Sequence, residues 1–264
     1  MTQILILGCG RLGTHVAHRL ITLGHQVHGV RRSSSTDASI PMTVGNAAET
    51  TTWAMLGSDW QAVLLCATPG LRRGRDNNLD RIAALVHERL PAARFVYSGS
   101  TAVYGDAGGA AVAEDGPLAA DAGPLLAIER AVLEQVDSLV LRMPALVGAA
   151  RDRAIIRARE AATAGKPLLI PGDPDRPFPF IHEQDAADVA TAALIGVLHQ
   201  ECGVMNAAAP IQLTARDYYR EASHRAKITT SIVSDGTTKP ARSIDSSRLW
   251  QFMSQYAWKS AWVD

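Results

Sequence analysis

The chain has 264 residues, of which 47% are hydrophobic and 20% charged, and its 26 basic side chains balance its 26 acidic ones. Proteins that bind nucleic acids or anionic membranes need an excess of positive charge, which this balance excludes, so we expect no nucleic-acid partner. No stretch approaches the roughly 20 apolar residues of a membrane-spanning helix, so we expect no membrane partner either. Three widely separated cysteines, Cys9, Cys66 and Cys202, fit neither a disulfide framework nor a four-ligand zinc site, so we predict a cytoplasmic protein with reduced thiols and no metal.

Short apolar runs alternate with amphipathic segments through the first half of the chain, a pattern typical of βα units in a parallel sheet. A buried strand is predicted at 3–7, and the helix predicted over 11–23 has one apolar face. Further strands are expected at 27–30, 42–44, 62–66, 94–97 and 139–141, and further helices at 51–56, 78–90 and 121–136. The predicted fold class is α/β, a doubly wound Rossmann sheet with a small C-terminal substrate lobe.

Prolines become frequent in the second half of the chain and separate isolated helices, which are expected at 151–164, 184–199 and 215–225. We therefore predict a Rossmann domain over residues 1–148 and a substrate-covering lobe over residues 149–264. The apolar segment 203–207 is predicted to return to the first domain as a strand, so that the two parts are interleaved in sequence.

The sequence Gly8-Cys9-Gly10-Arg11-Leu12-Gly13 directly follows the first strand and opens the first helix. In a G-x-G-x-x-G fingerprint, the three glycines serve a tight turn, the approach of a pyrophosphate to the backbone, and close packing of helix on strand. We expect the exposed backbone N–H groups around Arg11 and Leu12 to face the anion. A glycine-rich turn without a ligand is the alternative.

The residues that follow the second strand indicate which dinucleotide binds. NAD sites usually place an acidic residue there, about 20 residues after the fingerprint, but residues 27–33 contain no carboxylate. Arg31 and Arg32, with Ser33 beside them, are donors suited to a 2′-phosphate. The sequence therefore favours NADP(H) over NAD(H), although two exposed arginines can also simply end a strand.

Two further segments are candidates for the cofactor path. Asn46 follows the third strand and is placed to bond the adenine edge, although turn formation alone also explains it. Cys66, Ala67 and Thr68 end the fourth strand, beside the same expected crevice.

Several segments resemble a known family. Strand 94–97 leads into Ser98-Gly99-Ser100-Thr101-Ala102-Val103-Tyr104-Gly105, and the segments 141–148, 180–190 and 203–207 match later family motifs in the same order. The chain thereby resembles the extended short-chain dehydrogenases/reductases of the NAD-dependent epimerase/dehydratase family over nearly its full length. It is most similar to a compact atypical subgroup called YeeZ-like.

The resemblance implies that Ser100, with Thr101 beside it, contacts the substrate. It also implies a Tyr-x-x-x-Lys pair at the start of the next helix, in which the lysine lowers the pKa of the tyrosine. This sequence lacks that pair: one alignment places Asp121 and Leu125 at the two positions, and another places Leu125 and Glu129 there. Arg176 lies near the position where nucleotide-sugar enzymes hold the substrate diphosphate, with two additional residues between it and Ile181.

Three interpretations of the missing pair stay open. Asp121 replaces the tyrosine as proton donor, Tyr104 does so, or the protein binds NADP(H) without turnover; Asp121 can also simply stabilise a helix N-terminus. The leading hypothesis is an NADP(H)-dependent oxidoreductase or epimerase-like enzyme acting on a small polar metabolite, such as a carbonyl or an imine. A non-catalytic NADP(H)-binding partner protein and a nucleotide-sugar epimerase or dehydratase are the alternatives, and a homodimer is left open.

Overall fold

The alternating pattern builds one parallel sheet of seven strands, in the order β11-β7-β5-β4-β1-β2-β3. The structure is a computed structural model that describes residues 1–34, 37–71, 74–148 and 153–260. The strands of this sheet are β1 (Gln3–Leu7), β2 (Gln26–Arg31), β3 (Met42–Val44), β4 (Ala62–Leu65), β5 (Arg94–Ser100), β7 (Ser138–Met143) and β11 (Gly203–Asn206). The predicted doubly wound Rossmann sheet is confirmed.

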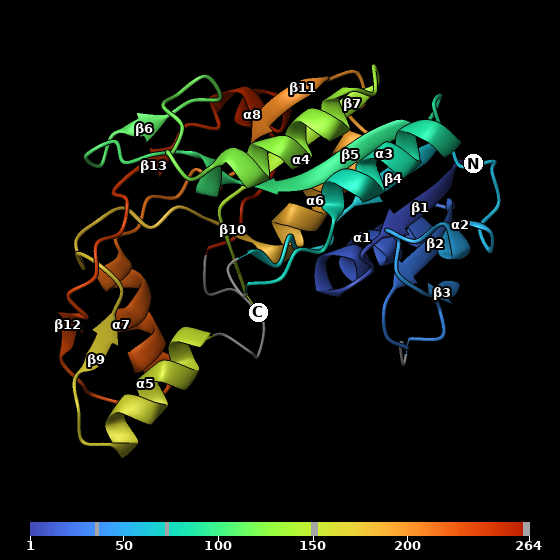
Figure 1. The fold of residues 1–264 in the computed structure, drawn as a ribbon. Coiled ribbons are helices and arrows are strands. Elements are labelled where there is room, and N and C mark those ends of the chain that lie inside the picture. The colour runs from blue at the N-terminus through green and yellow to red at the C-terminus, as the bar shows by residue number, and fades with distance from the viewer. Residues whose placement is uncertain (35–36, 72–73, 149–152, 261–264) are drawn as a thin grey trace.

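Both faces of the sheet are buried. Side chains alternate along a strand, so Ile4 and Ile6 belong to the core on one face and Leu5 and Leu7 to the core on the other, all of them fully buried. The first face is covered by α1 (Arg11–Thr22) and α6 (Glu183–Ile195), and the second by α2 (Thr50–Trp53), α3 (Leu79–Arg89) and α4 (Gly123–Leu133). Figure 1 shows α3 and α4 lying together on one side of the sheet.

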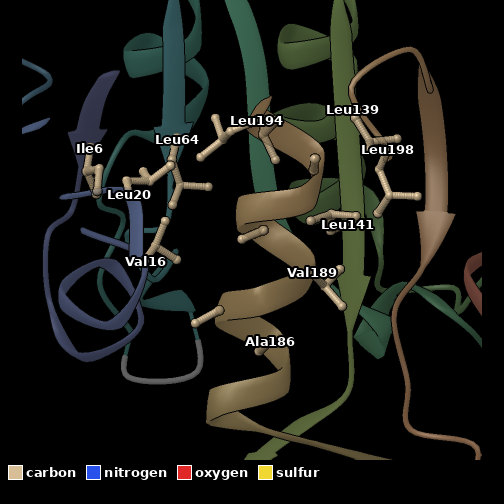
Figure 2. Close-up of a cluster of buried hydrophobic side chains, with 14 of the residues drawn as sticks. Ile6, Val16, Leu20, Leu64, Leu139, Leu141, Ala186, Val189, Leu194 and Leu198 are labelled. Atoms are coloured by element: carbon tan, nitrogen blue, oxygen red, sulfur yellow. The ribbon is translucent and has the colours of Figure 1, made fainter. Parts of the chain in front are cut away.

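The helix expected over 184–199 in the substrate lobe lies instead against the Rossmann sheet, as α6. Figure 2 shows Ala186, Val189 and Leu194 of α6 beside strand residues that include Leu141. Small and apolar residues occur all around α6, which suits a helix packed between α1 and the sheet strands β4, β5 and β7 rather than a half-exposed one. Together with β11, which pairs with β7, α6 makes residues beyond 148 part of the same core.

The remaining elements form the lobe and the segments that connect it to the sheet. The lobe holds α5 (Arg153–Thr163), α7 (Ala215–Arg225) and the pair of β9 (Leu168–Ile170) with β12 (Ile232–Ser234), and Figure 1 shows it standing apart at one end of the molecule. Two further pairs are β8 (Ala145–Val147) with β10 (Phe180–His182), and β6 (Ala111–Val112) with β13 (Ser243–Ile244). A short 3₁₀ helix, Thr101–Val103, follows β5, and α8 (Ser247–Phe252) lies near the C-terminus.

The bounds of α4 differ from the expected 121–136 at both ends. Pro124 occupies the first turn, so the helix begins at Gly123 and leaves Asp121 in the preceding turn. Its end is fixed by Gln135, whose side chain donates to the carbonyl oxygens of Leu90 and Ala93. For the helix expected from residue 151, residues 151–152 lie outside the described residues. Within the described residues, no helix combines the length and the hydropathy needed to cross a bilayer.

Candidate functional site

The centre of the sheet carries a cavity at the carboxyl ends of its strands. The chain winds outward in opposite directions from β1 and β4, which are neighbours, and such a switch point leaves a crevice for ligands. A cavity of about 680 Å³ lies there. Its walls come from the ends of β1, β2, β3, β4, β5 and β7 and the residues that follow them.

The surroundings of the three fingerprint glycines differ from one glycine to the next. Gly8 has a φ of +84°, and a Cβ atom there would lie 2.5 Å from the backbone nitrogen of Ala67. A Cβ atom at Gly13 would lie 3.0 Å from Cys66 Sγ, so this glycine permits close packing of α1 on the sheet. At Gly10, which lines the cavity, the nearest atom would be 3.7 Å away. The open space at Gly10 therefore faces the ligand cavity.

Arg11 and Leu12 also line the cavity, and the Arg11 guanidinium is bound by groups outside the fingerprint. Its Nη2 donates to the carbonyl oxygen of Gly148 at 2.9 Å and to Glu183 Oε1 at 2.8 Å. Glu183 is buried at the start of α6. Arg11 thus joins the fingerprint turn to α6 and to the end of β8.

Basic side chains from the end of β2 form one wall of the cavity, as predicted. Arg31, Arg32 and Ser33 all line it, and Arg31 Nη2 donates to Ser33 Oγ at 3.2 Å. Arg32 Nη1 donates to Oδ1 of Asn77, a residue that sequence reasoning missed, at 2.9 Å. No acidic side chain is among the described residues that line the cavity.

The expected adenine-side residues also meet at this cavity. Asn46 lines it, but its Nδ2 donates to Glu49 Oε1 and its Oδ1 accepts from the Ala48 backbone, so its amide also holds the local turn. Cys66, Ala67 and Thr68 line the cavity directly beside the fingerprint glycines. Burial raises the pKa of the Cys66 thiol, which donates to the Gly8 carbonyl oxygen at 3.2 Å and therefore stays protonated.

Ser100 lies at the other end of the cavity, together with Ser98, Gly99 and three apolar residues, Met143, Pro144 and Leu146. The Ser100 Oγ accepts from the Ala102 backbone N–H at 3.1 Å, which fixes the side chain at the end of β5. Thr101, the neighbouring candidate, is buried in the 3₁₀ helix and is not a lining residue. Ser100 therefore lines the cavity, whereas Thr101 is buried next to it.

Tyr104 is placed away from the cavity. Its ring is fully buried, and its hydroxyl donates to Asn206 Oδ1 at 2.6 Å and accepts from Arg142 Nη1 at 2.9 Å. Arg142 in turn binds both carboxylate oxygens of Glu129, at 2.7–3.2 Å. Burial raises the pKa of Tyr104. Tyr104 therefore lies in a buried network and not among the described lining residues of the cavity, and Glu129 belongs to the same network.

Asp121 and Arg176 are also absent from the described lining residues. Asp121 is exposed in the turn before α4. The Arg176 guanidinium donates to the carbonyl oxygens of Pro171 and Pro177 in its own loop, and its burial lowers its pKa. The structure therefore does not bring these two candidates to Ser100.

Besides Asn77, the cavity wall contains Tyr97 and Ile82, which sequence reasoning missed. Burial, together with the nearby Glu129 carboxylate, raises the pKa of Tyr97. A signal for Tyr97 was available, because it ends the strand segment that leads to Ser100. No comparable signal existed for Asn77, which lies in the long connection between β4 and α3.

The sheet order and the fingerprint geometry define a Rossmann-type α/β protein. The sequence matches the model of the NAD dependent epimerase/dehydratase family over residues 4–207, and the chain belongs to that family. Comparison with curated proteins found no match.

Solved structures share this fold over almost their whole length. A UDP-N-acetylglucosamine 4-epimerase from Bacillus cereus has a TM-score of 0.76 at 17% identity, with 98% of this chain and 95% of that one covered. A dTDP-glucose 4,6-dehydratase from Bacillus anthracis, in complex with NAD, has a TM-score of 0.79 at 16% identity, with 98% and 92% covered. A UDP-glucuronic acid 4-epimerase from Bacillus cereus, also in complex with NAD, has a TM-score of 0.73 at 16% identity, with 98% and 94% covered.

Proposed function

We propose that this protein is an NADP(H)-dependent oxidoreductase or epimerase-like enzyme that acts on a small polar metabolite with a carbonyl or imine group. The observation that supports it most is that one cavity is lined by Gly8 and Gly10 of the fingerprint, by the Arg31, Arg32 and Ser33 cluster, and by Ser100. The family to which the chain belongs is named for NAD-dependent enzymes. The choice of NADP(H) rests on this chain's own residues.

The residues around the cavity fit such a cofactor. Gly10 leaves room where a pyrophosphate would meet the start of α1, and no acidic side chain occupies the first turn of that helix. Arg31 and Arg32 supply the positive charge that a 2′-phosphate needs, since charge-assisted hydrogen bonds from arginine suit phosphate oxygens. In the neighbours crystallised with NAD, the cofactor named is the one without that phosphate.

A nicotinamide at the Ser100 end of the cavity would supply hydride transfer. The Ser98 and Ser100 hydroxyls would bind a substrate oxygen or nitrogen there, beside the apolar side chains of Met143, Pro144 and Leu146. Neither Asp121 nor Tyr104 reaches this end of the cavity. A substrate that carries its own proton, such as a protonated imine, needs no tyrosine with a lowered pKa.

Specific observations favour two other candidates to a lesser degree. The missing Tyr-x-x-x-Lys pair and the buried position of Tyr104 support a non-catalytic NADP(H)-binding protein. The neighbours' names support a nucleotide-sugar epimerase or dehydratase. Against the latter, the Arg176 guanidinium is engaged by carbonyl oxygens of its own loop.

Titrations of NADPH and NADH, followed by a turnover screen, test the proposal. Wild-type protein should bind NADPH more tightly, and Arg31→Asp should weaken NADPH binding by about tenfold or more, because a hydrogen bond to a charged group contributes about 1.5–3 kcal/mol. NADH binding should change little. Equal wild-type affinities for the two cofactors would refute the assignment of NADP(H). Stoichiometric NADPH binding with no turnover over a broad panel of carbonyls and imines would favour the non-catalytic candidate.

A further inference from the structure

The side chain of Asn77 joins two walls of the cavity that are far apart in sequence. Its Oδ1 accepts from Arg32 Nη1 at 2.9 Å, at the end of β2. Its Nδ2 donates to the carbonyl oxygen of Thr68 at 2.6 Å, after β4. All three residues line the cavity. Both ends of one amide are therefore used to hold Arg32 against the segment that follows β4.

The local backbone is built to bring that amide into place. The Asn77 backbone N–H donates to the Pro69 carbonyl oxygen at 3.1 Å, which fixes its position relative to the end of β4. Gly70 has a φ of +83°, and a Cβ atom there would lie 2.9 Å from Asn77 Nδ2. A residue other than glycine at position 70 would thus displace the amide.

Arg32 needs such support because it is exposed. An unrestrained arginine samples many rotamers, and fixing it on a ligand costs side-chain entropy. The bond to Asn77 engages Nη1, while an arginine guanidinium carries five N–H groups in a planar fork. The remaining N–H groups are free to turn toward the cavity as donors for an anion.

We propose that Asn77 is a positioning residue that makes the site selective for NADP(H) over NAD(H), by holding the Arg32 guanidinium where a 2′-phosphate would lie. This inference rests on the proposed NADP(H) function. The neutral amide suits this position because it accepts from Arg32 without adding negative charge next to the phosphate. Asn77 acts through Arg32, so its contribution depends on the arginine being present.

Dissociation constants for NADPH and NADH, measured by titration on the full chain, test this role. Asn77→Ala should raise the NADPH dissociation constant by about 3- to 10-fold, the worth of one hydrogen bond, and leave that for NADH within about twofold. Asn77→Asp retains the size of the side chain but pairs its charge with Arg32 and repels the phosphate. It should therefore weaken NADPH binding by about tenfold or more and lower the ratio of NADPH to NADH affinity further than alanine does.

A double-variant cycle separates this role from a structural one. In an Arg32→Ala background, Asn77→Ala should cause no further loss of NADPH affinity. The control is Arg75→Ala, which removes an exposed cation from the same connection outside the cavity wall and should leave both affinities unchanged. Thermal melting confirms that each variant is folded.

The outcomes distinguish the two levels of the hypothesis. Equal losses of NADPH and NADH affinity in the Asn77 variants, or an NADPH loss that persists without Arg32, would overturn the positioning role, since Asn77 would then merely hold the Thr68 segment. A wild type that prefers NADPH, with the preference unchanged in both Asn77 variants, would overturn this inference alone. A wild type without any preference would overturn both this inference and the proposed cofactor.

Discussion

Replacing Tyr104 with phenylalanine removes one hydroxyl group from the buried network around Arg142. Asn206 Oδ1, which lies 2.6 Å from that hydroxyl in a residue that is 0% exposed, then loses this donor. Arg142 is affected less, because it keeps the Glu129 carboxylate and the Glu114 carbonyl oxygen. A buried acceptor left without a donor costs about 1–3 kcal/mol, so we expect the free energy of unfolding to fall by about 2 kcal/mol.

Urea denaturation and thermal melting measure this loss. For a chain of this size the midpoint temperature should fall by about 4–8 °C, since each kcal/mol corresponds to about 2–4 °C. The matched control is Tyr219→Phe, whose hydroxyl accepts an exposed bond of 3.4 Å from Arg157 and whose loss should cost less than about 0.5 kcal/mol. NADPH affinity should not change in either variant. Unchanged stability in Tyr104→Phe, combined with loss of turnover, would refute the structural assignment and make Tyr104 the proton donor.

Three further predictions concern the cavity and the sheet. Gly10→Val should remain folded by circular dichroism, because a Cβ atom at position 10 meets nothing closer than 3.7 Å. The variant should bind neither NADPH nor NADH, because its side chain would fill the space of the pyrophosphate, and normal binding would mean that the fingerprint is only a structural turn. Asp121→Asn should leave the pH–rate profile of any active substrate unchanged, because Asp121 is exposed and is not among the described lining residues of the cavity. Loss of the acidic or basic limb of that profile in Asp121→Asn would instead make Asp121 the proton donor. Burial lowers the pKa of His28, so the unfolded state binds more protons than the folded state as the pH falls through 6.5, and the free energy of unfolding should decrease on acidification. In His28→Gln, denaturation between pH 7.5 and 5 should show a weaker dependence of this free energy on pH, and an unaltered dependence would contradict the reasoning.

The part of the site that depends on short-range order was predictable from sequence. Strand β1, the fingerprint glycines and the start of α1 are consecutive, so the turn, the helix and their packing are all encoded within one short segment. Arg31 and Arg32 were predictable for a related reason, since the end of a strand next to β1 in a doubly wound sheet faces the same crevice. Ser100 followed from the family resemblance and from its position at the end of β5.

The structure places both proton-donor candidates outside the described lining of the cavity, because a motif does not define where a side chain points. The direction of the Tyr104 hydroxyl is decided by Asn206, 102 residues later in the chain, and by Arg142 on a neighbouring strand. The position of Asp121 depends on where α4 begins, and Pro124 in the first turn sets that start. Asn77 was missed because its role arises only when the end of β2 meets the segment after β4.

The crossing of α6 and β11 into the Rossmann sheet has a consequence for synthesis on the ribosome. When the first 148 residues have emerged, the sheet lacks its outermost strand, and the apolar face that contacts α6 is uncovered beside α1. Residues 183–206 complete it, and at a typical elongation rate of about 5–20 residues per second they follow several seconds later. During that interval the nascent chain exposes apolar surface and an unpaired strand edge, the features that chaperones recognise. Chains truncated after β7 should expose the same apolar surface and strand edge permanently.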